Sequence, residues 1–267
     1  MMVHMTSQPT VRSWDKPGPD NDRRLCLAAD IEQYSRFDTP GQRTAQAQLA
    51  RVLKTAAERS GLDHGAWSVQ PQGDMEFAVL PAGTSEQVVL GEYVAHLATE
   101  LGGYNATLRP AGRMRLRLAI DTGVAATAAL GFSGPAPIAV ARYLNAPEVK
   151  RALAAAGPAS LVVVISDRLY QDVVRSRFHG HDPDQYRRIH VEQKGFAGYG
   201  WVRLPGVDPQ DVGEPWPDAP EGRPRPAARA AEAERPSFVQ QGVHGTAVQG
   251  VIHGSVVHGV VPGGAGR

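Results

Sequence analysis

The 267-residue sequence has few of the features that mark disulfide-rich, membrane-spanning or nucleic-acid-binding proteins. Its single cysteine, Cys26, excludes a disulfide within the chain, and its place in an apolar run favours a small buried residue over a reactive thiol. No run approaches the roughly 18 apolar residues of a spanning helix. The formal net charge is only +1, so electrostatics gives no sign of nucleic-acid binding. We therefore expect a cytoplasmic protein without membrane or nucleic-acid partners.

Composition divides the sequence into four segments. Residues 1–22 are a predicted disordered leader, because they lack the apolar core of about 7–15 residues that a signal peptide needs. Residues 23–205 alternate strand-like and helix-like patterns and form the predicted domain. Residues 206–236 are dense in Pro, Ala, Glu and Arg, which is typical of a disordered linker. Residues 237–267 are a tail rich in Gly, Val and His.

Two aspartates stand out because each lies at the end of a predicted strand. Asp30 comes at the end of the apolar run that begins at Leu25, and Asp74 forms with Gly73 a predicted tight turn between two alternating segments. Adjacent strand ends would bring both carboxylates to one site, where rigid oxygen ligands suit Mg²⁺ or Mn²⁺. Taken alone, each aspartate has the alternative role of a strand-end cap or turn residue.

The predicted elements follow the order β-α-β-β-α-β, with a further α/β extension. Helices are expected at 44–62, 88–103 and 167–174, and strands at 25–31, 67–81, 113–123, 160–166 and 187–204. From Met114 to Arg117, apolar and basic residues alternate, which predicts a strand with one buried and one solvent-exposed face.

Three motifs in this order resemble those of the class III nucleotidyl cyclase catalytic domain, known from adenylate and guanylate cyclases. ADIEQYS stands where that family has an aspartate, a hydrophobic residue, a glycine, an aromatic and a hydroxyl residue. RLAIDTG is similar to its Arg-rich strand that ends in Gly, and VEQKGF to its closing Lys-Gly hairpin. The resemblance covers residues 23–205. It implies an α+β fold of ferredoxin-like βαββαβ type with an antiparallel-rich sheet.

The resemblance also implies roles for residues near the first strand. Asp30 and Asp74 would bind two Mg²⁺ or Mn²⁺ ions, with the backbone carbonyl of Ile31 as a further ligand. Tyr34 and Ser35 would close the first turn over the triphosphate of a nucleoside triphosphate, where helix N-terminal N–H groups favour anionic oxygens.

Two cations would complete the catalytic set. Arg142 stands at the place of the family's transition-state arginine, and Lys194 would contact the terminal phosphates. Their alternatives are a solvated helix arginine and a lysine on a hairpin surface. In the family, the carboxylates come from one domain and the arginine from another, so a single copy implies a homodimer.

Three positions depart from the family pattern. Gln70 stands where adenylate cyclases carry a purine-reading lysine, Gly131 where their purine-reading aspartate would stand, and Ile138 where an asparagine positions the ribose. Gln70 can still hydrogen-bond a base edge, whereas the other two side chains cannot. The base is therefore open, a pyrimidine included. Two functions follow: a divergent cyclase that forms a cyclic nucleoside monophosphate by two-metal phosphoryl transfer, or an inactive nucleotide-binding or adaptor protein.

The tail carries an uncharged repeat in which Val-His-Gly or Ile-His-Gly recurs. Its candidate interaction residues are Val243, His244, Gly245, Val251, Ile252, His253, Gly254, Val257, His258 and Gly259. Such β-prone segments can stack in register, and this one resembles the amyloid signalling motifs of bacterial immunity-type proteins. The resemblance implies homotypic assembly with a partner receptor that carries a matching motif. The alternatives are a disordered tail or a short β-hairpin that caps the domain.

Overall fold

The computed structural model describes residues 22–157, 159–177, 180–207, 248–252 and 255–259. They belong to two units, Met1–Glu221 and Gly222–Arg267, and each unit is described by itself. The following predictions lie outside the described residues: the leader up to residue 21, the linker from residue 208, and the tail residues Val243, His244, Gly245, His253 and Gly254.

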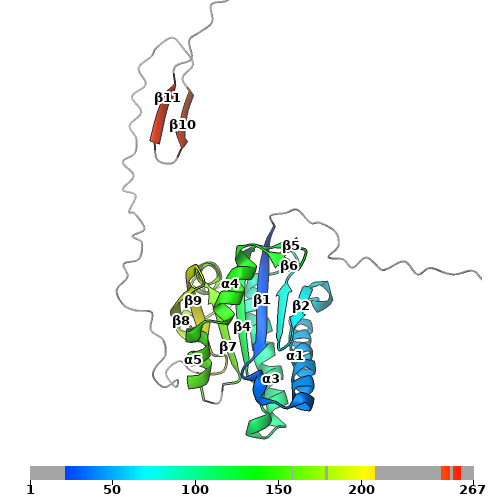
Figure 1. Ribbon diagram of the computed structural model, residues 1–267. Helices are drawn as coiled ribbons and strands as arrows, with labels where there is room; N and C mark the ends of the chain where they lie inside the picture. Colours follow the sequence, from blue (N-terminus) through cyan, green and yellow to red (C-terminus); the bar gives the residue numbers. More distant parts are fainter. Residues whose placement is uncertain (1–21, 158, 178–179, 208–247, 253–254, 260–267) are drawn as a thin grey trace, which may run out of the picture. The chain divides into compact units, whose positions relative to one another are not determined.

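The first unit is built on a seven-stranded sheet with the strand order β2-β3-β1-β4-β7-β9-β8 (Figure 1). The strands are β1 (Arg23–Ile31), β2 (Ser68–Gln72), β3 (Met75–Val79), β4 (Leu116–Val124), β7 (Leu161–Ser166), β8 (Arg187–Gln193) and β9 (Phe196–Arg203). Neighbouring strands are antiparallel, except that β4 and β7 are parallel. Together with α1 (Thr39–Arg59) and α3 (Val94–Ala106), the first four strands give the order β-α-β-β-α-β. The predicted α+β fold with an antiparallel-rich sheet is confirmed.

Helices pack on both faces of this sheet. One core lies between the sheet and α1 and α3, and the other lies under α4 (Pro135–Leu144) and α5 (Pro147–Ala155), which Figure 1 shows crossing the near face. Because side chains alternate along a strand, Leu27 and Ala29 of β1 face α1 and α3, while Cys26 and Ala28 face α4 and α5. The same alternation directs Asp30 to the α4/α5 face.

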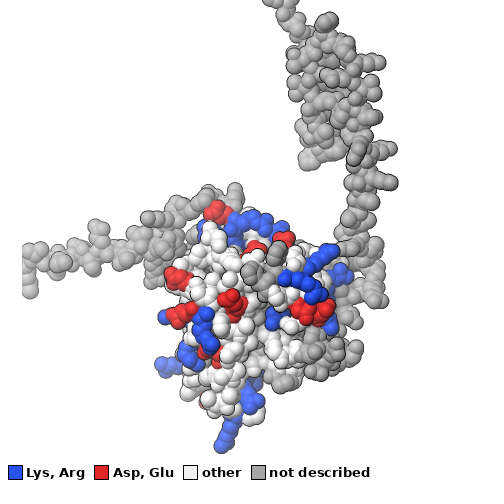
Figure 2. Space-filling view, turned by 180° about the vertical axis from the view of Figure 1, so that it is seen from behind, with Lys and Arg blue, Asp and Glu red and all other residues white. Residues whose placement is uncertain are grey.

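The outer surface carries charges of both signs. On the face opposite to that of Figure 1, Figure 2 shows small groups of acidic and basic side chains between large uncharged areas. Among the described residues visible there, no broad area carries one sign alone. This distribution agrees with the formal net charge of +1.

Helix α1 begins five residues before the predicted start at residue 44 and ends three residues before the predicted end. The Asp38 side chain accepts a hydrogen bond from the Gly41 N–H at 2.9 Å, and Pro40 lies in the first turn. Both are established signals of a helix start. The helix stops before Gly61, whose φ of 69° suits glycine.

Short elements complete the unit. They are α2 (Glu86–Val88), α6 (Asp167–Leu169), the π-helical turns η4 (Val89–Tyr93) and η6 (Tyr170–Val174), the 3₁₀ turns η2 (Tyr34–Arg36), η3 (His64–Ala66), η5 (Pro110–Gly112) and η8 (Pro183–Gln185), and the hairpin strands β5 (Ala126–Ala128) and β6 (Gly131–Ser133). The β5–β6 hairpin, which no sequence pattern predicted, forms a small sheet of its own. Among the described residues, no helix has the length and apolar character to cross a membrane.

The second unit contains an antiparallel hairpin of β10 (Val248–Ile252) and β11 (Ser255–Gly259), with Val251 opposite Val256. The hairpin includes the predicted interaction residues Val251, Ile252, Val257, His258 and Gly259. Its assembly with other copies stays a prediction.

Candidate active site

Asp30 and Asp74 come together at one end of the central strands. Asp30 lies in β1 opposite Met75 of β3, and the Ile31 N–H donates to the Asp74 carbonyl at 3.1 Å. Gly73, with a φ of 65°, allows the tight turn that brings Asp74 to this position. The juxtaposition predicted from the sequence is therefore present in the fold.

Arg117 pairs with Asp30 in a two-pronged ion pair. Its Nε donates to Asp30 Oδ1 at 2.7 Å and its second terminal nitrogen donates to Oδ2 at 2.6 Å. The side chains of Arg117 and Asp30 are only 12% and 10% exposed. The strand register sets this pair, because the two residues lie directly opposite each other in β1 and β4.

The prediction that the basic face of β4 is solvent-exposed was wrong. Arg117 is held by Asp30, and Arg115 forms an ion pair with Glu32 at 3.2 Å. Arg115 also donates to the backbone carbonyls of Leu153 and Ala159, at the end of α5 and just beyond it. Helices α4 and α5 cover this face of the sheet. The alternation of apolar and basic residues in β4 therefore reflects two buried faces and not one buried and one solvent-exposed face.

Asp30 and Asp74, together with the turn that holds them, form what we call the carboxylate corner, and the charges of both aspartates affect each other there. The pKa of the Asp30 carboxyl is raised above its ordinary value, chiefly because the group is buried, and the nearby charge of Asp74 raises it further. The hydrogen bonds and charge of Arg117, and the charge of Lys150, act in the opposite direction. In the described part of the chain, the Asp74 carboxylate has no hydrogen bond or ion pair of its own.

These residues fit a divalent cation. A carboxylate has about four lone-pair sites, so Arg117 leaves acceptor positions on Asp30, and the Asp74 carboxylate lacks a partner among the described residues. Two like charges near each other are the arrangement that a bound cation would stabilise. Within the described ranges, no group of three or more His, Cys, Asp or Glu side chains gathers. The protein ligands would therefore be Asp30, Asp74 and the Ile31 carbonyl, with the remaining positions left to substrate or water oxygens.

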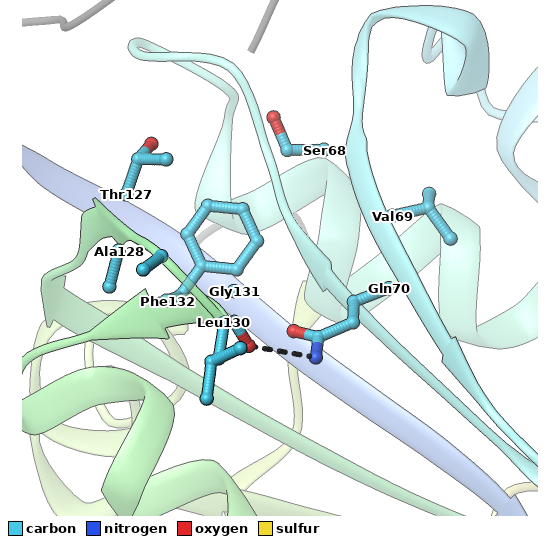
Figure 3. Close-up of a pocket in the computed structure, with 9 residues that line it drawn as sticks. Ser68, Val69, Gln70, Thr127, Ala128, Leu130, Gly131 and Phe132 are labelled. Atoms are coloured by element: carbon cyan, nitrogen blue, oxygen red, sulfur yellow. Dashed lines mark hydrogen bonds between the residues drawn. The ribbon is translucent and has the colours of Figure 1, made fainter. Parts of the chain in front are cut away.

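The predicted base-reading positions also meet, on the side of β2 and the β5–β6 hairpin. The Gln70 side-chain amide donates to the Leu130 carbonyl at 3.4 Å, as the dashed line in Figure 3 shows. A Cβ atom at Gly131 would lie 2.3 Å from Gln70 Oε1, and the φ of Gly131 is 125°. Only glycine fits at position 131 beside this conformation of Gln70.

A groove runs from this pair toward the carboxylates. One cavity of about 250 Å³ lies between β2 and the hairpin, and a second of about 220 Å³ continues to Ala28 and Phe77. Both are lined by Gln70, Leu130 and Phe132. Ala28 precedes Asp30 by two residues on the same face of β1, and Met75 follows Asp74, so the second cavity lies next to the two aspartates, although neither of them lines it.

Helix α4 carries two of the predicted residues on its outer face. Ile138 is 51% exposed, and Arg142 follows one turn later. Arg142 makes no ion pair with the described residues, and its buried Nε has no hydrogen-bond partner there. The groove itself is lined by Pro137 and Ala141, not by Ile138.

Lys194 lies at the exposed tip of the β8–β9 hairpin, with a φ of 47°. Strands β4 and β7 separate β9 from β1 in the sheet. Tyr143 connects α4 to this hairpin, because its hydroxyl donates to the Tyr199 carbonyl at 2.8 Å and its ring meets Phe196 edge-on at 5.3 Å. Within the described residues, no ion pair links Arg142 or Lys194 to either aspartate.

Tyr34 and Ser35, the two predicted residues in the turn after β1, have different surroundings. The Tyr34 ring packs against the core, and its hydroxyl accepts a hydrogen bond from Gln46 at 2.7 Å. Ser35 is exposed. The fold fixes Tyr34 as part of the turn's support, while contact of either residue with a triphosphate stays a prediction.

Comparisons with known proteins give structural neighbours only. No family model matches the sequence, and no curated protein matches it. The crystal structure of the guanylyl cyclase Cya2 is 15% identical, with a TM-score of 0.49 over 76% of this chain and 98% of that chain. The adenylate/guanylate cyclase/hydrolase from Silicibacter pomeroyi is 17% identical, with a TM-score of 0.49 over 70% and 99%. The guanylate cyclase domain of RhGC from Catenaria anguillulae, solved in complex with GTP, is 16% identical, with a TM-score of 0.43 over 68% and 96%. Similarity at this level assigns no role to any residue.

Proposed function

We propose that the domain is a divergent nucleotidyl cyclase, which forms a cyclic nucleoside monophosphate and pyrophosphate from a nucleoside triphosphate. The observation that supports this most is the meeting of Asp30 and Asp74 next to a groove that is lined by Gln70, Ala28 and Met75. A nucleotide whose base contacts Gln70 would lie along this groove and place its phosphates near the two carboxylates. The protein would act in the cytoplasm.

Two Mg²⁺ or Mn²⁺ ions would lower the proton affinity of the ribose 3′-hydroxyl and neutralise charge on the triphosphate. Asp30, Asp74 and the Ile31 carbonyl would hold them. Arg117 fixes the orientation of the Asp30 carboxylate. The Arg142 guanidinium would stabilise charge on the phosphate oxygens, and Lys194 would bind the terminal phosphates.

A homodimer would bring these groups together. The carboxylates lie at β1 and the β2–β3 turn, whereas Arg142 lies on the outer face of α4 and Lys194 on a hairpin near the far edge of the sheet. A large apolar side chain, Leu130, is 94% exposed beside the groove, and Ile138 is exposed on α4. A second copy would cover these side chains and, in an isologous contact, complete two equivalent sites.

The alternative is a nucleotide-binding or adaptor protein that does not cyclise. Two observations favour it. Arg117 already donates hydrogen bonds to the Asp30 carboxylate, and positions 131 and 138 have no polar side chain. The base would then be held by Gln70 and backbone groups alone.

The tail would couple this domain to other proteins. Both strands of the β10–β11 hairpin are sheet edges within the described residues, so each has backbone groups free to pair with another copy. We propose homotypic assembly with a receptor that carries a matching motif. Deletion of residues 237–267 should leave basal turnover of concentrated protein nearly intact and abolish receptor-triggered activation; unchanged triggering would remove the tail from the mechanism.

The test of the enzymatic proposal is incubation of the full chain with each of the four ribonucleoside triphosphates and Mn²⁺, followed by chromatography. A cyclic monophosphate that is absent with the Asp74→Asn variant supports the proposal and names the base. Saturable nucleotide binding without any cyclic product from the four would instead favour the adaptor.

A further inference from the structure

A separate cavity lies where η2, the end of α3, η5 and the residues just before β4 and β7 meet. Its volume is about 510 Å³. It shares none of its lining residues with the groove between Gln70 and the aspartates. The lining includes three arginines, Arg36, Arg113 and Arg115, together with Asn105 and Ser160.

Two of the three arginines have guanidinium groups available for a ligand. Arg115 is committed, since it pairs with Glu32 and donates to two backbone carbonyls. Arg36 donates to the Arg113 carbonyl and lies over the Phe37 ring, but it forms no ion pair with any described residue. The Arg113 side chain has no hydrogen bond or ion pair in the described part of the chain. The cavity therefore has two cations that no described carboxylate balances.

The floor of the cavity is rigid and polar. Asn105 is 5% exposed, and its side-chain amide donates to the Met114 carbonyl at 2.7 Å and accepts from the Met114 N–H at 2.8 Å. The same amide donates to Ser160 Oγ at 3.0 Å. Because Ser160 Oγ acts as the acceptor in that bond, its own proton is available to a ligand oxygen.

We propose that this cavity binds a small anion with a phosphate group, through the guanidinium groups of Arg36 and Arg113 and the hydroxyl of Ser160. Two guanidinium groups match the two negative charges of a phosphate monoester, and their planar donor sets suit tetrahedral oxyanions. The site does not depend on the proposed cyclase activity. Arg36 belongs to the turn that follows Asp30 and Ile31, so an occupied cavity would restrain that turn and provide a route to regulate the carboxylate corner.

The experiment is a titration of the full chain, in EDTA and without nucleotide, followed by the NMR signals of the arginine side-chain Nε–Hε groups. Inorganic phosphate and pyrophosphate are the probes. We expect saturable shifts of the Arg36 and Arg113 signals. The Arg113→Ala variant should weaken the affinity by about tenfold, the effect of losing one charge-assisted contact. Arg113 is exposed, so this variant should fold, and a thermal unfolding curve checks that it does.

The control is Arg43→Ala, which removes an exposed arginine of α1 that does not line the cavity. Equal affinity in the Arg113→Ala and Arg43→Ala variants, or the absence of saturation at about 10 mM phosphate, would overturn the proposal. Citrate separates phosphate recognition from general attraction of anions. Binding of citrate as tightly as pyrophosphate would contradict a phosphate site. Because neither metal nor nucleotide is present, the result is independent of whether the domain cyclises anything.

Discussion

The pair of aspartates and the neighbouring groove are built in different ways. At the carboxylate corner, Asp30 is fixed by its strand neighbours and by a two-pronged ion pair, and Asp74 is fixed by the turn that joins β2 and β3. In the groove, Gln70 lies beside Gly131 and donates one hydrogen bond of 3.4 Å to the Leu130 carbonyl. The aspartates belong to the central part of the sheet, whereas Gln70 lies on an edge strand that faces a small separate hairpin.

This difference has a physical consequence for how sequence can vary. A substitution of Asp30 removes the ion pair with Arg117 and changes the charge balance of a buried site. A substitution in the β5–β6 hairpin leaves the seven-stranded sheet in place. If the proposed cyclase activity holds, a change at Gln70 or Gly131 should alter base selectivity and leave the two aspartates in place.

The largest expected effect is at the aspartates. Asp30→Ala and Asp74→Ala should each abolish metal-dependent product formation, since each removes a proposed cation ligand. Their stabilities should differ: Asp30→Ala leaves Arg117 buried without a partner and should cost about 3 kcal/mol, whereas Asp74→Ala should change the free energy of unfolding by less than about 0.5 kcal/mol. Urea titration and product assays measure both. Near-normal turnover in either variant would rule out the metal assignment.

The next effect is at Arg142. Arg142→Ala should lower kcat by roughly 10²–10³, the usual scale for loss of one charge partner in a transition state. Arg151→Ala, on α5, is the matched control, because Arg151 forms only an exposed pair with Glu148. A change confined to KM would show that Arg142 only binds substrate.

A smaller effect tests the groove at Gln70. Gly131→Ala would place a Cβ against Gln70 and force it to move, so it should change the ratio of kcat/KM values between two bases by about tenfold while keeping most of the turnover. Gly83→Ala is the control, since Gly83 also has a positive φ of 77°, but a Cβ added there would meet no atom within 4 Å. Unchanged base selectivity in Gly131→Ala would show that Gln70 and Gly131 do not contact the base of the substrate.

The smallest effect concerns β1 itself. Burial raises the pKa of the Cys26 thiol to about 12 from an ordinary value of 9.0. The folded protein should therefore resist a thiol reagent at mildly alkaline pH and react at once in denaturant. Because the pKa is higher in the folded state, the unfolded state loses its proton first, and the thiol should lower stability as the pH rises from about 9 to about 12. Cys26→Ser would remove that part of the pH dependence in urea titrations; rapid labelling of the native chain would contradict a closed β1.

The sequence predicted single strands and turns, but it did not predict contacts between residues that are far apart in the chain. The apolar run before Asp30 and the Gly73-Asp74 turn predicted β1 and the β2–β3 hairpin, because side-chain alternation and turn chemistry are local properties. The ion pair between Arg117 and Asp30 joins residues 87 apart in the chain, so no local pattern shows it. The strands of β5 and β6 have three residues each, which is too few to show a period. Asp38 and Pro40 signal the early start of α1 in the sequence. The prediction placed the start later because it relied on the apolar spacing, which begins further along the helix.

The most direct test of the central claim, two partial sites on one chain that a second copy completes, is a mixing experiment. Asp74→Ala and Arg142→Ala variants are each assayed alone and then as an equimolar mixture that has been allowed to exchange subunits. Random pairing gives one intact site in each mixed dimer, so the mixture should recover about a quarter of the activity of the unmodified protein. Activity equal to the average of the two separate variants, at concentrations where mixed dimers are detected, would contradict a site shared between two copies.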